Sequence, residues 1–262
     1  MKLVSLGFLC LFSFSLFAQN SIEGIVKDYE TKNPVPYVNI GIVKKDKGTV
    51  STEEGKFELE IPANLMNDTI KLSSIGYHPK LIRVKNFVAI LKENQTIRLG
   101  PKITELDEVI VTNKKLTKKR VGNKTKKKMV KGVCGFADAG VELGVKIKIK
   151  DRPTYIEKFH VNIVSNTSEK VKFRINFYNI KNGLPNEKII KDNIIFTINV
   201  KEGDFTLDLE KYKIVVEEDF YSTIELLENQ KEEEVVFFSA KLFGNPTMYR
   251  YSSQGKWTKS NT

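Results

Sequence analysis

Few residues in this chain of 262 have types and spacing that could carry chemistry. Its two histidines are His78 and His160, and no HExxH or CxxC pattern occurs, so sequence neighbours compose no zinc site. The sequence also lacks a GxSxG elbow, a Walker loop and a GxGxxG turn. We therefore predict no catalytic, cofactor-binding or metal-ligating residue and no cofactor.

Carboxylates leave one alternative open. The chain holds 32 Asp and Glu residues. Two carboxylates that hydrolyse a glycosidic bond need only be close in space, so their spacing in the sequence does not reveal them. A hydrolase whose catalytic carboxylates are dispersed over the C-terminal half is therefore the alternative to a non-catalytic protein.

Aromatic residues near the C-terminus form the other candidate site. Tyr249, Tyr251 and the only tryptophan, Trp257, lie in the last fourteen residues of the chain among polar neighbours. Such rings could stack on a sugar and bind it. The competing interpretation is that Trp257 fills the open end of a β-sandwich, because large aromatic side chains dominate core burial.

The first residues have the pattern of a secretory signal peptide. Lys2 precedes an apolar run from Leu3 to Phe17, and Ala18 and Gln19 flank the expected cleavage site. At about 15 residues the run is shorter than the roughly 20 that span a bilayer. We therefore expect residues 1–18 to be removed, and the mature chain to be exported and without a transmembrane segment.

The segment after the leader predicts a small all-β domain, assigned to residues 19–112. Seven short strands are expected, separated by turn residues. They span residues 22–27, 37–44, 48–51, 56–61, 69–73, 80–84 and 96–99. Gly55 stands where a hairpin turn needs a positive φ. Phe57, Leu59 and Ile61 alternate with charged residues and should face the core.

A basic segment, residues 113–131, follows and is interpreted as the interdomain linker. It contains ten Lys and Arg residues and no acid, and the whole chain has a net charge of +11. Lys126, Lys127 and Lys128 either belong to a solvated connector or dock on an anionic membrane or glycan surface. The leader and the lack of interleaved aromatic rings argue against nucleic acid.

The second half, residues 132–262, again alternates apolar and polar residues. Phe173, Ile175 and Phe177 are one such series, and Asn182-Gly183 supplies a turn. About eight or nine strands fit a jelly-roll-like β-sandwich. The fold class is therefore all-β, with two sandwiches joined by the basic linker.

The N-terminal segment resembles the carboxypeptidase regulatory-like domain, a transthyretin-like seven-stranded sandwich. Thr52 departs from the Asp or Asn that is usual before the hairpin glycine. The resemblance rests on five ordered motifs: Gly24-Ile-Val26, Pro34-Val-Pro-Tyr-Val-Asn-Ile40, Gly55-Lys-Phe57, Ser74-Ile-Gly-Tyr77 and Leu106-Asp-Glu-Val-Ile-Val111. It implies a non-catalytic accessory domain in a bacterium with two membranes, where the chain would be periplasmic or outer-membrane associated.

One short sequence indicates a possible modification. Asp68-Thr69-Ile70 resembles the Asp-Thr-aliphatic sequence that some bacterial envelope systems O-glycosylate. The competing interpretation of Thr69 is the start of a strand. Together these observations favour an exported, non-catalytic envelope protein that binds or scaffolds a protein partner or a glycan. The alternative is a hydrolase of envelope glycan.

Overall fold

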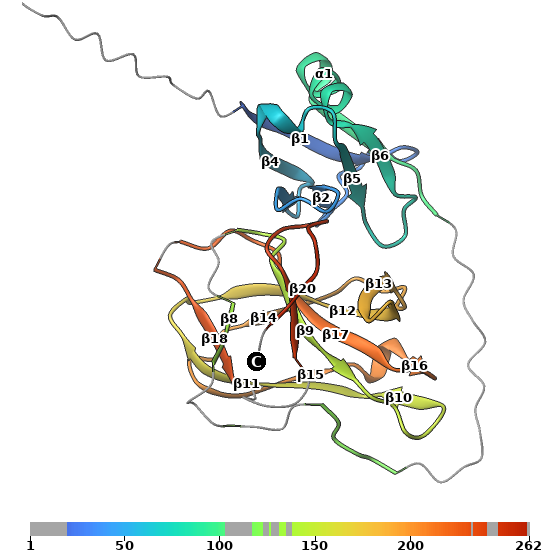
Figure 1. Cartoon of the computed structure of the whole chain (residues 1–262), viewed down its shortest axis with the longest axis vertical. Helices are drawn as coiled ribbons and strands as arrows, with labels where there is room; N and C mark the ends of the chain where they lie inside the picture. Colours follow the sequence, from blue (N-terminus) through green and yellow to red (C-terminus); the bar gives the residue numbers. More distant parts are fainter. Residues whose placement is uncertain are drawn as a thin grey trace, which may run out of the picture.

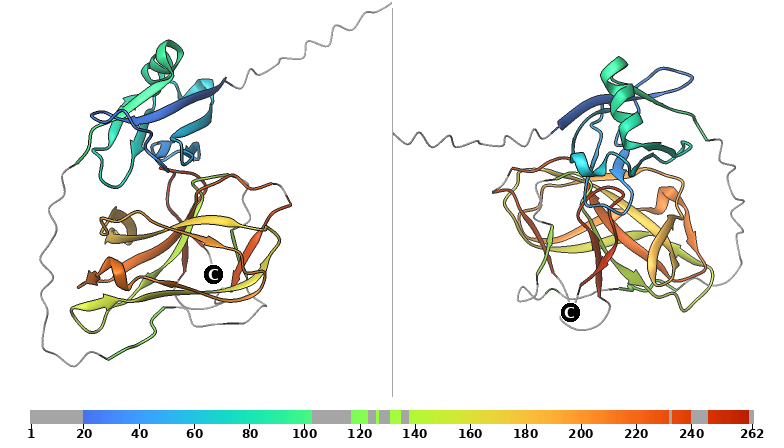
Figure 2. Two further views of the ribbon diagram at one scale, coloured as in Figure 1. Left: turned by 180° about the vertical axis from the view of Figure 1, so that it is seen from behind. Right: turned by 45° about the horizontal axis from the view of Figure 1, so that its top comes forward.

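The computed structural model shows an all-β protein with two sandwich-like parts (Figure 1). It describes residues 20–102, 117–122, 126, 131–134, 138–231, 233–239 and 246–260. The smaller, N-terminal part lies against one end of the larger, C-terminal part in both views of Figure 2. The leader, its cleavage site at Ala18 and Gln19, and the expected strand at residues 106–111 lie outside the described residues.

The N-terminal part contains the seven expected strands. A three-stranded sheet, β4-β1-β7, faces a four-stranded sheet, β3-β2-β5-β6. The strands are β1 (Asn20–Asp28), β2 (Asn39–Ile42), β3 (Gly48–Val50), β4 (Lys56–Ile61), β5 (Thr69–Ser73), β6 (Lys80–Arg83) and β7 (Thr96–Leu99), with a 3₁₀ turn η1 (Ala63–Leu65). Phe57, Leu59 and Ile61 of β4 are buried, which confirms the predicted alternation.

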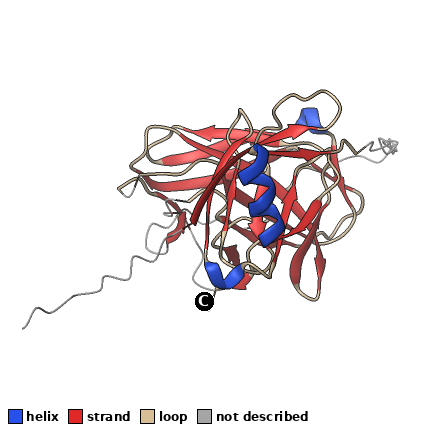
Figure 3. Ribbon diagram, turned by 90° about the horizontal axis from the view of Figure 1, so that it is seen from above, coloured by secondary structure: helices blue, strands red, loops and turns tan. Residues whose placement is uncertain are grey.

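One element of this part was not predicted as a helix. The apolar run around Phe87 lies in α1 (Val84–Asn94), which covers one side of the N-terminal sandwich (Figure 3). Val84, Phe87 and Leu91 are spaced by three and four residues, so they share one helix face, and all three are buried. The left-handed residue Gln95 ends the helix and leads directly into β7.

The C-terminal part is built from two main sheets and a short strand pair. The larger sheet has the order β13-β12-β17-β9-β19-β20 with β14 also on β12, the second has the order β15-β11-β18-β8, and β10 pairs β16. The strands are β8 (Lys131–Cys134), β9 (Glu142–Ile147), β10 (Thr154–Ile156), β11 (Lys158–Asn166), β12 (Val171–Lys181), β13 (Leu184–Lys188), β14 (Ile194–Ile198), β15 (Gly203–Asp208), β16 (Ile214–Val216), β17 (Phe220–Leu226), β18 (Val236–Ser239), β19 (Thr247–Arg250) and β20 (Thr258–Lys259), with a 3₁₀ turn η2 (Glu210–Tyr212).

The core of the C-terminal part lies between its sheets. Phe173, Ile175 and Phe177 of β12 point into it, as does Ile224 of β17. Because side chains alternate along a strand, the residues between them must point to the opposite face of the larger sheet. Within the described ranges, no helix is both long and apolar enough to cross a membrane.

Gly55 has the predicted positive φ, at 73°, and a Cβ added there would lie 2.6 Å from the carbonyl oxygen of Val26. Gly55→Val should therefore lower the free energy of unfolding by about 1–3 kcal/mol, through backbone strain and steric conflict. Urea denaturation followed by circular dichroism measures this. Gly100→Ala is the matched control, since no atom lies within 4 Å of a Cβ at Gly100. Equal midpoints for the two variants would contradict the assignment.

Candidate functional site

The outer face of the larger C-terminal sheet carries an unusual set of buried polar side chains. They come from four neighbouring strands, β12, β17, β9 and β19, and on β12, β17 and β9 these polar side chains alternate with core residues of the same strand. Four of them are completely shielded from solvent: Glu142, Arg174, Asn176 and Glu225. Because burying a charge is costly unless it is paired, the partners of these groups decide what the face can do.

Glu225 and Arg174 form the central ion pair. They lie opposite each other on β17 and β12. The Nε and one terminal nitrogen of Arg174 donate to the same Glu225 oxygen, Oε2, at 3.0 and 2.9 Å. Asn176 donates a third hydrogen bond to that oxygen at 3.0 Å. Such charge-assisted bonds are the strong class of hydrogen bond in proteins.

Glu142 is the second buried carboxylate and lies opposite Glu225 on the neighbouring strand β9. Its Oε1 accepts hydrogen bonds from Asn176, at 2.9 Å, and from Thr223. Its Oε2 accepts from the Tyr178 hydroxyl, at 3.2 Å, and from Arg250 of β19. Each carboxylate therefore has its own arginine, and the Asn176 amide donates to both.

The N-terminal part completes this network. Arg174 donates to the backbone carbonyl of Tyr37 at 2.9 Å and to Asn39 Oδ1 at 2.7 Å. The Asn39 amide in turn donates to the other oxygen of Glu225 and, at 2.9 Å, to Ser253 Oγ. The buried ion pair thus lies at the contact between the two sandwiches, and residues of both satisfy it.

Two glycines bring the backbones of the two parts together. Gly41 of β2 and Gly48 of β3 face the carbonyl oxygen of Ser253. A Cβ would lie 1.9 Å from this oxygen at Gly41 and 2.2 Å from it at Gly48. No side chain fits there, so the close approach requires glycine at both positions.

A second contact flanks the network. Lys172 donates to the Tyr37 hydroxyl at 2.9 Å and pairs with Glu228 at 2.7 Å. Tyr37 and Val50 also pack with Ala139 and Leu227 in one apolar cluster, which joins the two parts. The interface therefore combines a buried ion pair, an apolar cluster and a close backbone contact.

The electrostatics of the site keep Glu225 ionised. Burial alone would raise the pKa of its carboxyl, but Arg174, Lys188 and Arg250 outweigh burial and lower the pKa to about 2. Burial and the Glu142 charge raise the pKa of Tyr178 well above its ordinary value, so its phenol stays protonated. Glu225 is therefore a fixed hydrogen-bond acceptor.

The predicted aromatic site is divided in the structure. Trp257 packs edge-on against Tyr178, with ring centroids 5.7 Å apart, and Arg250 lies over its ring at 4.9 Å. Tyr249 and Tyr251 contact each other at 5.2 Å, and Tyr249 lies opposite Leu143, which packs on the core. Tyr249 and Arg250 are adjacent on one strand, so they face opposite ways. The three rings do not form one platform.

Three described lysines of the basic segment, Lys118, Lys119 and Lys126, are ion-paired with the C-terminal sandwich. Lys126 pairs with Asp204, and Lys119 pairs with Asp151 at 2.8 Å. Lys127 and Lys128 lie outside the described residues. Since exposed ion pairs are weak, docking of Lys126 on an anionic surface stays a prediction.

Thr69 is the first residue of β5 and is half-buried. It lies opposite Arg83 of β6, and its carbonyl accepts a hydrogen bond from the Val43 backbone at 2.9 Å. Its O-glycosylation stays a prediction.

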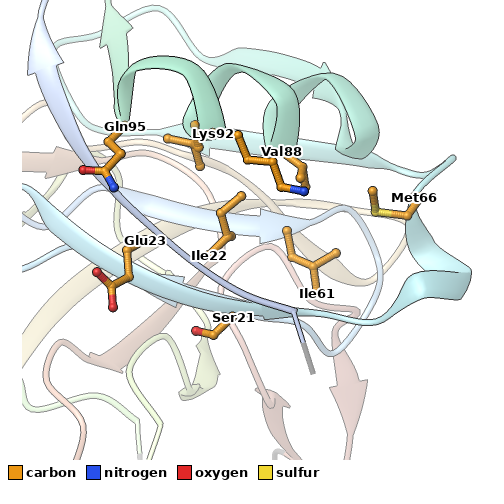
Figure 4. Close-up of a pocket in the computed structure, with 9 residues that line it drawn as sticks. Ser21, Ile22, Glu23, Ile61, Met66, Val88, Lys92 and Gln95 are labelled. Carbon is orange, nitrogen blue, oxygen red and sulfur yellow. The ribbon is translucent and has the colours of Figure 1, made fainter. Parts of the chain in front are cut away.

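One concave site lies in the N-terminal part, between α1 and the sheet below it (Figure 4). The pocket has a volume of about 340 Å³. Figure 4 shows Val88 and Lys92 on the helix above Ile22 and Ile61 on the strands. Its lining combines apolar side chains such as Ile22 and Val88 with the polar Glu23, Lys92 and Gln95, so the pocket is not uniformly apolar.

Sequence reasoning missed the ionic network. Its signal in the strand patterns is weak: Arg174 takes an ordinary polar position in the alternating series from Val171 to Phe177, whereas Glu225 stands between Ile224 and Leu226 in an otherwise uncharged strand. A charged residue in a strand that is otherwise buried needs a buried partner. The partner could not be named, because pairing across β9, β12, β17 and β19 depends on strand register.

Comparison with known proteins assigns the N-terminal part. Residues 22–111 match the CarboxypepD_reg-like domain, in agreement with the resemblance inferred from the motifs. A search of the curated proteins gave no match. The chain therefore carries a CarboxypepD_reg-like domain.

The ion pair yields a stability prediction. Glu225→Gln leaves the Arg174 charge buried without its counter-charge and should cost roughly 3–5 kcal/mol of unfolding free energy. The double variant Arg174→Met with Glu225→Leu should lose less than the sum of the losses of Arg174→Met and of Glu225→Leu made singly. Chemical denaturation measures all four variants. Asp151→Asn, which breaks an exposed pair, is the control and should cause no measurable change. Additive losses would show that the pair is not coupled.

The lowered pKa of Glu225 yields a pH prediction. Its carboxyl is more acidic in the folded chain, about 2, than at its ordinary value of 4.5, so protonation favours unfolding. Its stabilising contribution is complete above about pH 4.5 and is lost as the pH falls toward 2. Urea denaturation between pH 5 and 2 should show a steeper decline for the native chain than for Glu225→Gln. Parallel declines would refute the shift.

Proposed function

We propose that this chain is an exported, non-catalytic envelope protein that binds or scaffolds a protein partner or a glycan, with its two sandwiches acting as one rigid unit. The observation that carries this proposal is the buried ion pair of Arg174 and Glu225, which Asn39 of the other sandwich completes. A contact of this kind fixes the relative position of two domains, as a scaffold requires.

The export proposal rests on the signal-peptide pattern of residues 1–18, and the periplasmic or outer-membrane location rests on the domain resemblance. The CarboxypepD_reg-like domain supports an accessory role. The two most shielded carboxylates, Glu142 and Glu225, are both fully buried and each is bound by an arginine.

A hydrolase of envelope glycan is the second candidate. The observation in its favour is that Glu142 and Glu225 lie directly opposite each other on neighbouring strands. A glycosidase needs one carboxyl that gives up a proton and a second that reaches the sugar or a water molecule. Here both carboxylates accept several hydrogen bonds and neither has exposed surface, so we favour the binding protein.

The test is a cross-linked pull-down of the tagged mature chain from intact envelopes, with mass spectrometry of proteins and glycans. We expect reproducible recovery of one envelope protein or one glycan. The variant Gly41→Val should lose most of this recovery, because its side chain collides with Ser253 and separates the two sandwiches. Gly100→Ala, with open space at its Cβ, is the matched control. Recovery of nothing, or glycan cleavage by the purified chain, would reject the proposal.

A further inference from the structure

The edge of β1 that faces β7 is open at the start of the strand. The Ile25 N–H donates to the Gln95 carbonyl, just before β7, at 2.9 Å, and the Val26 N–H donates to Gly55, just before β4, at 2.8 Å. Because the backbone groups of successive strand residues point to opposite sides, every second residue of β1 faces β7. The register partner of Ile25 is Thr96, the first residue of β7, so β7 does not reach the residues of β1 that precede Ile25.

Ser21 and Glu23 are the two residues that this arrangement leaves unpaired. Both continue the series of Ile25, so their backbone N–H and C=O groups point to the side where β7 has not yet begun. Among the described residues, no strand lies there and neither backbone makes a hydrogen bond on that side. Unpaired N–H and C=O groups at a sheet edge are a template on which another extended chain can pair.

The pocket under α1 lies along this open edge. Ser21, Ile22 and Glu23 line it as consecutive residues of β1, and Lys92 and Gln95 line it from the end of the helix. The other lining residues are apolar: Ile61, Met66, Val88 and Leu91. Figure 4 shows Ile22 and Ile61 directed toward the helix. A strand added to β1 would therefore direct every second side chain into this pocket of about 340 Å³.

The opposite face of the sheet is acidic beside the open edge. Glu23 lies opposite Glu58 of β4 in the register, and Glu60 is exposed on the same face. None of these three carboxylates has an ion pair among the described residues. The one basic residue of β4, Lys56, lies opposite Ile25, past the open edge. Like charges directly opposite each other are destabilising, so a cation on an added strand would relieve this repulsion.

We propose that the open edge of β1 binds, by strand addition, an extended segment of a partner protein in which apolar and basic residues alternate. The apolar side chains enter the pocket under α1, and the basic side chains lie beside Glu23 and Glu58. Lys92, on the pocket side, disfavours a second cation there, so the alternation is part of the recognition. The proposal gives a surface to the protein partner of the proposed function and rests on it in that respect.

Other occupants match fewer of these features. A small apolar molecule would fill the pocket and leave the backbone groups of Ser21 and Glu23 unpaired. A glycan lacks the regular series of N–H and C=O groups that a strand edge pairs with. An acidic extended segment would be repelled by Glu23 and Glu58. An alternating apolar and basic strand satisfies the backbone, the pocket and the acidic face together.

Fluorescence anisotropy with the full mature chain, at physiological ionic strength, tests the proposal. The probe is a labelled peptide with blocked ends, Lys-Val-Lys-Ile-Lys-Val-Lys, and we expect it to bind saturably. The same peptide with Glu in place of each Lys, and a scrambled peptide of the same composition with its lysines together, should bind at least tenfold more weakly. Equal binding of the scrambled peptide would reduce the contact to a general attraction of charge and overturn the proposal.

Two N-methylated peptides test the backbone pairing. One is methylated at the amides of its apolar residues and the other at the amides of its lysines. Only one of these two sets of amides faces β1 in an added strand, so one peptide should lose at least tenfold in affinity and the other should lose less. Unchanged binding of both would show that no strand is added.

Variants of the protein locate the site. Val88→Lys places a cation in the pocket and should weaken binding of the alternating peptide at least tenfold. Ala89→Lys is the matched control, because it adds the same charge on the exposed side of α1 and should change the affinity little. Thermal melting checks that both variants fold. Equal losses in the two variants, or no saturable binding to the native chain, would reject this surface.

The peptide experiment and the envelope pull-down fail separately. The pull-down can recover a partner or a glycan while the alternating peptide does not bind, and the proposed function then stands without this surface. The peptide can also bind while the pull-down recovers nothing, which would leave a strand-binding edge in a chain that is not an envelope scaffold.

Discussion

The arrangement of this protein depends on the ion pair between Arg174 and Glu225. Neither charge can be buried on the outer face of a sheet unless something covers it and supplies the remaining hydrogen bonds. Tyr37 and Asn39 provide that cover, and both belong to the other sandwich. The charges therefore require the contact between the sandwiches, and their hydrogen bonds to Tyr37 and Asn39 in turn hold that contact in place.

This mutual requirement explains other features of the interface. Glycine at positions 41 and 48 allows the strands of the small sandwich to approach Ser253 closely enough for Asn39 to reach Glu225. Directional groups such as a bidentate arginine fix geometry more strictly than apolar packing does. An interface with both elements restricts rotation of one sandwich on the other.

The sequence predicts the strands of this fold better than it predicts the ionic network. Alternating residues and turn glycines located all seven N-terminal strands, because strand periodicity is a local property. The helix around Phe87 was missed, since the short apolar run Phe87-Val-Ala-Ile-Leu91 does not distinguish a strand from a helix, and only Val84 before it extends the helical spacing. The ionic network was missed for a deeper reason. Glu142, Arg174 and Glu225 are far apart in the sequence, and only strand register brings them together.

The same physical argument bears on catalysis and on binding. A catalytic carboxylate must change its protonation state or reach a substrate, and the lowered pKa of Glu225 and the burial of both glutamates oppose this. Lys71 and Lys188, in contrast, are half-buried lysines at the border of the network, and burial is the first cause that lowers the pKa of each. The interface between the sandwiches therefore holds two kinds of charged group side by side. The fully buried ion pair fixes the two domains, and burial disfavours the charged form of the two lysines beside it.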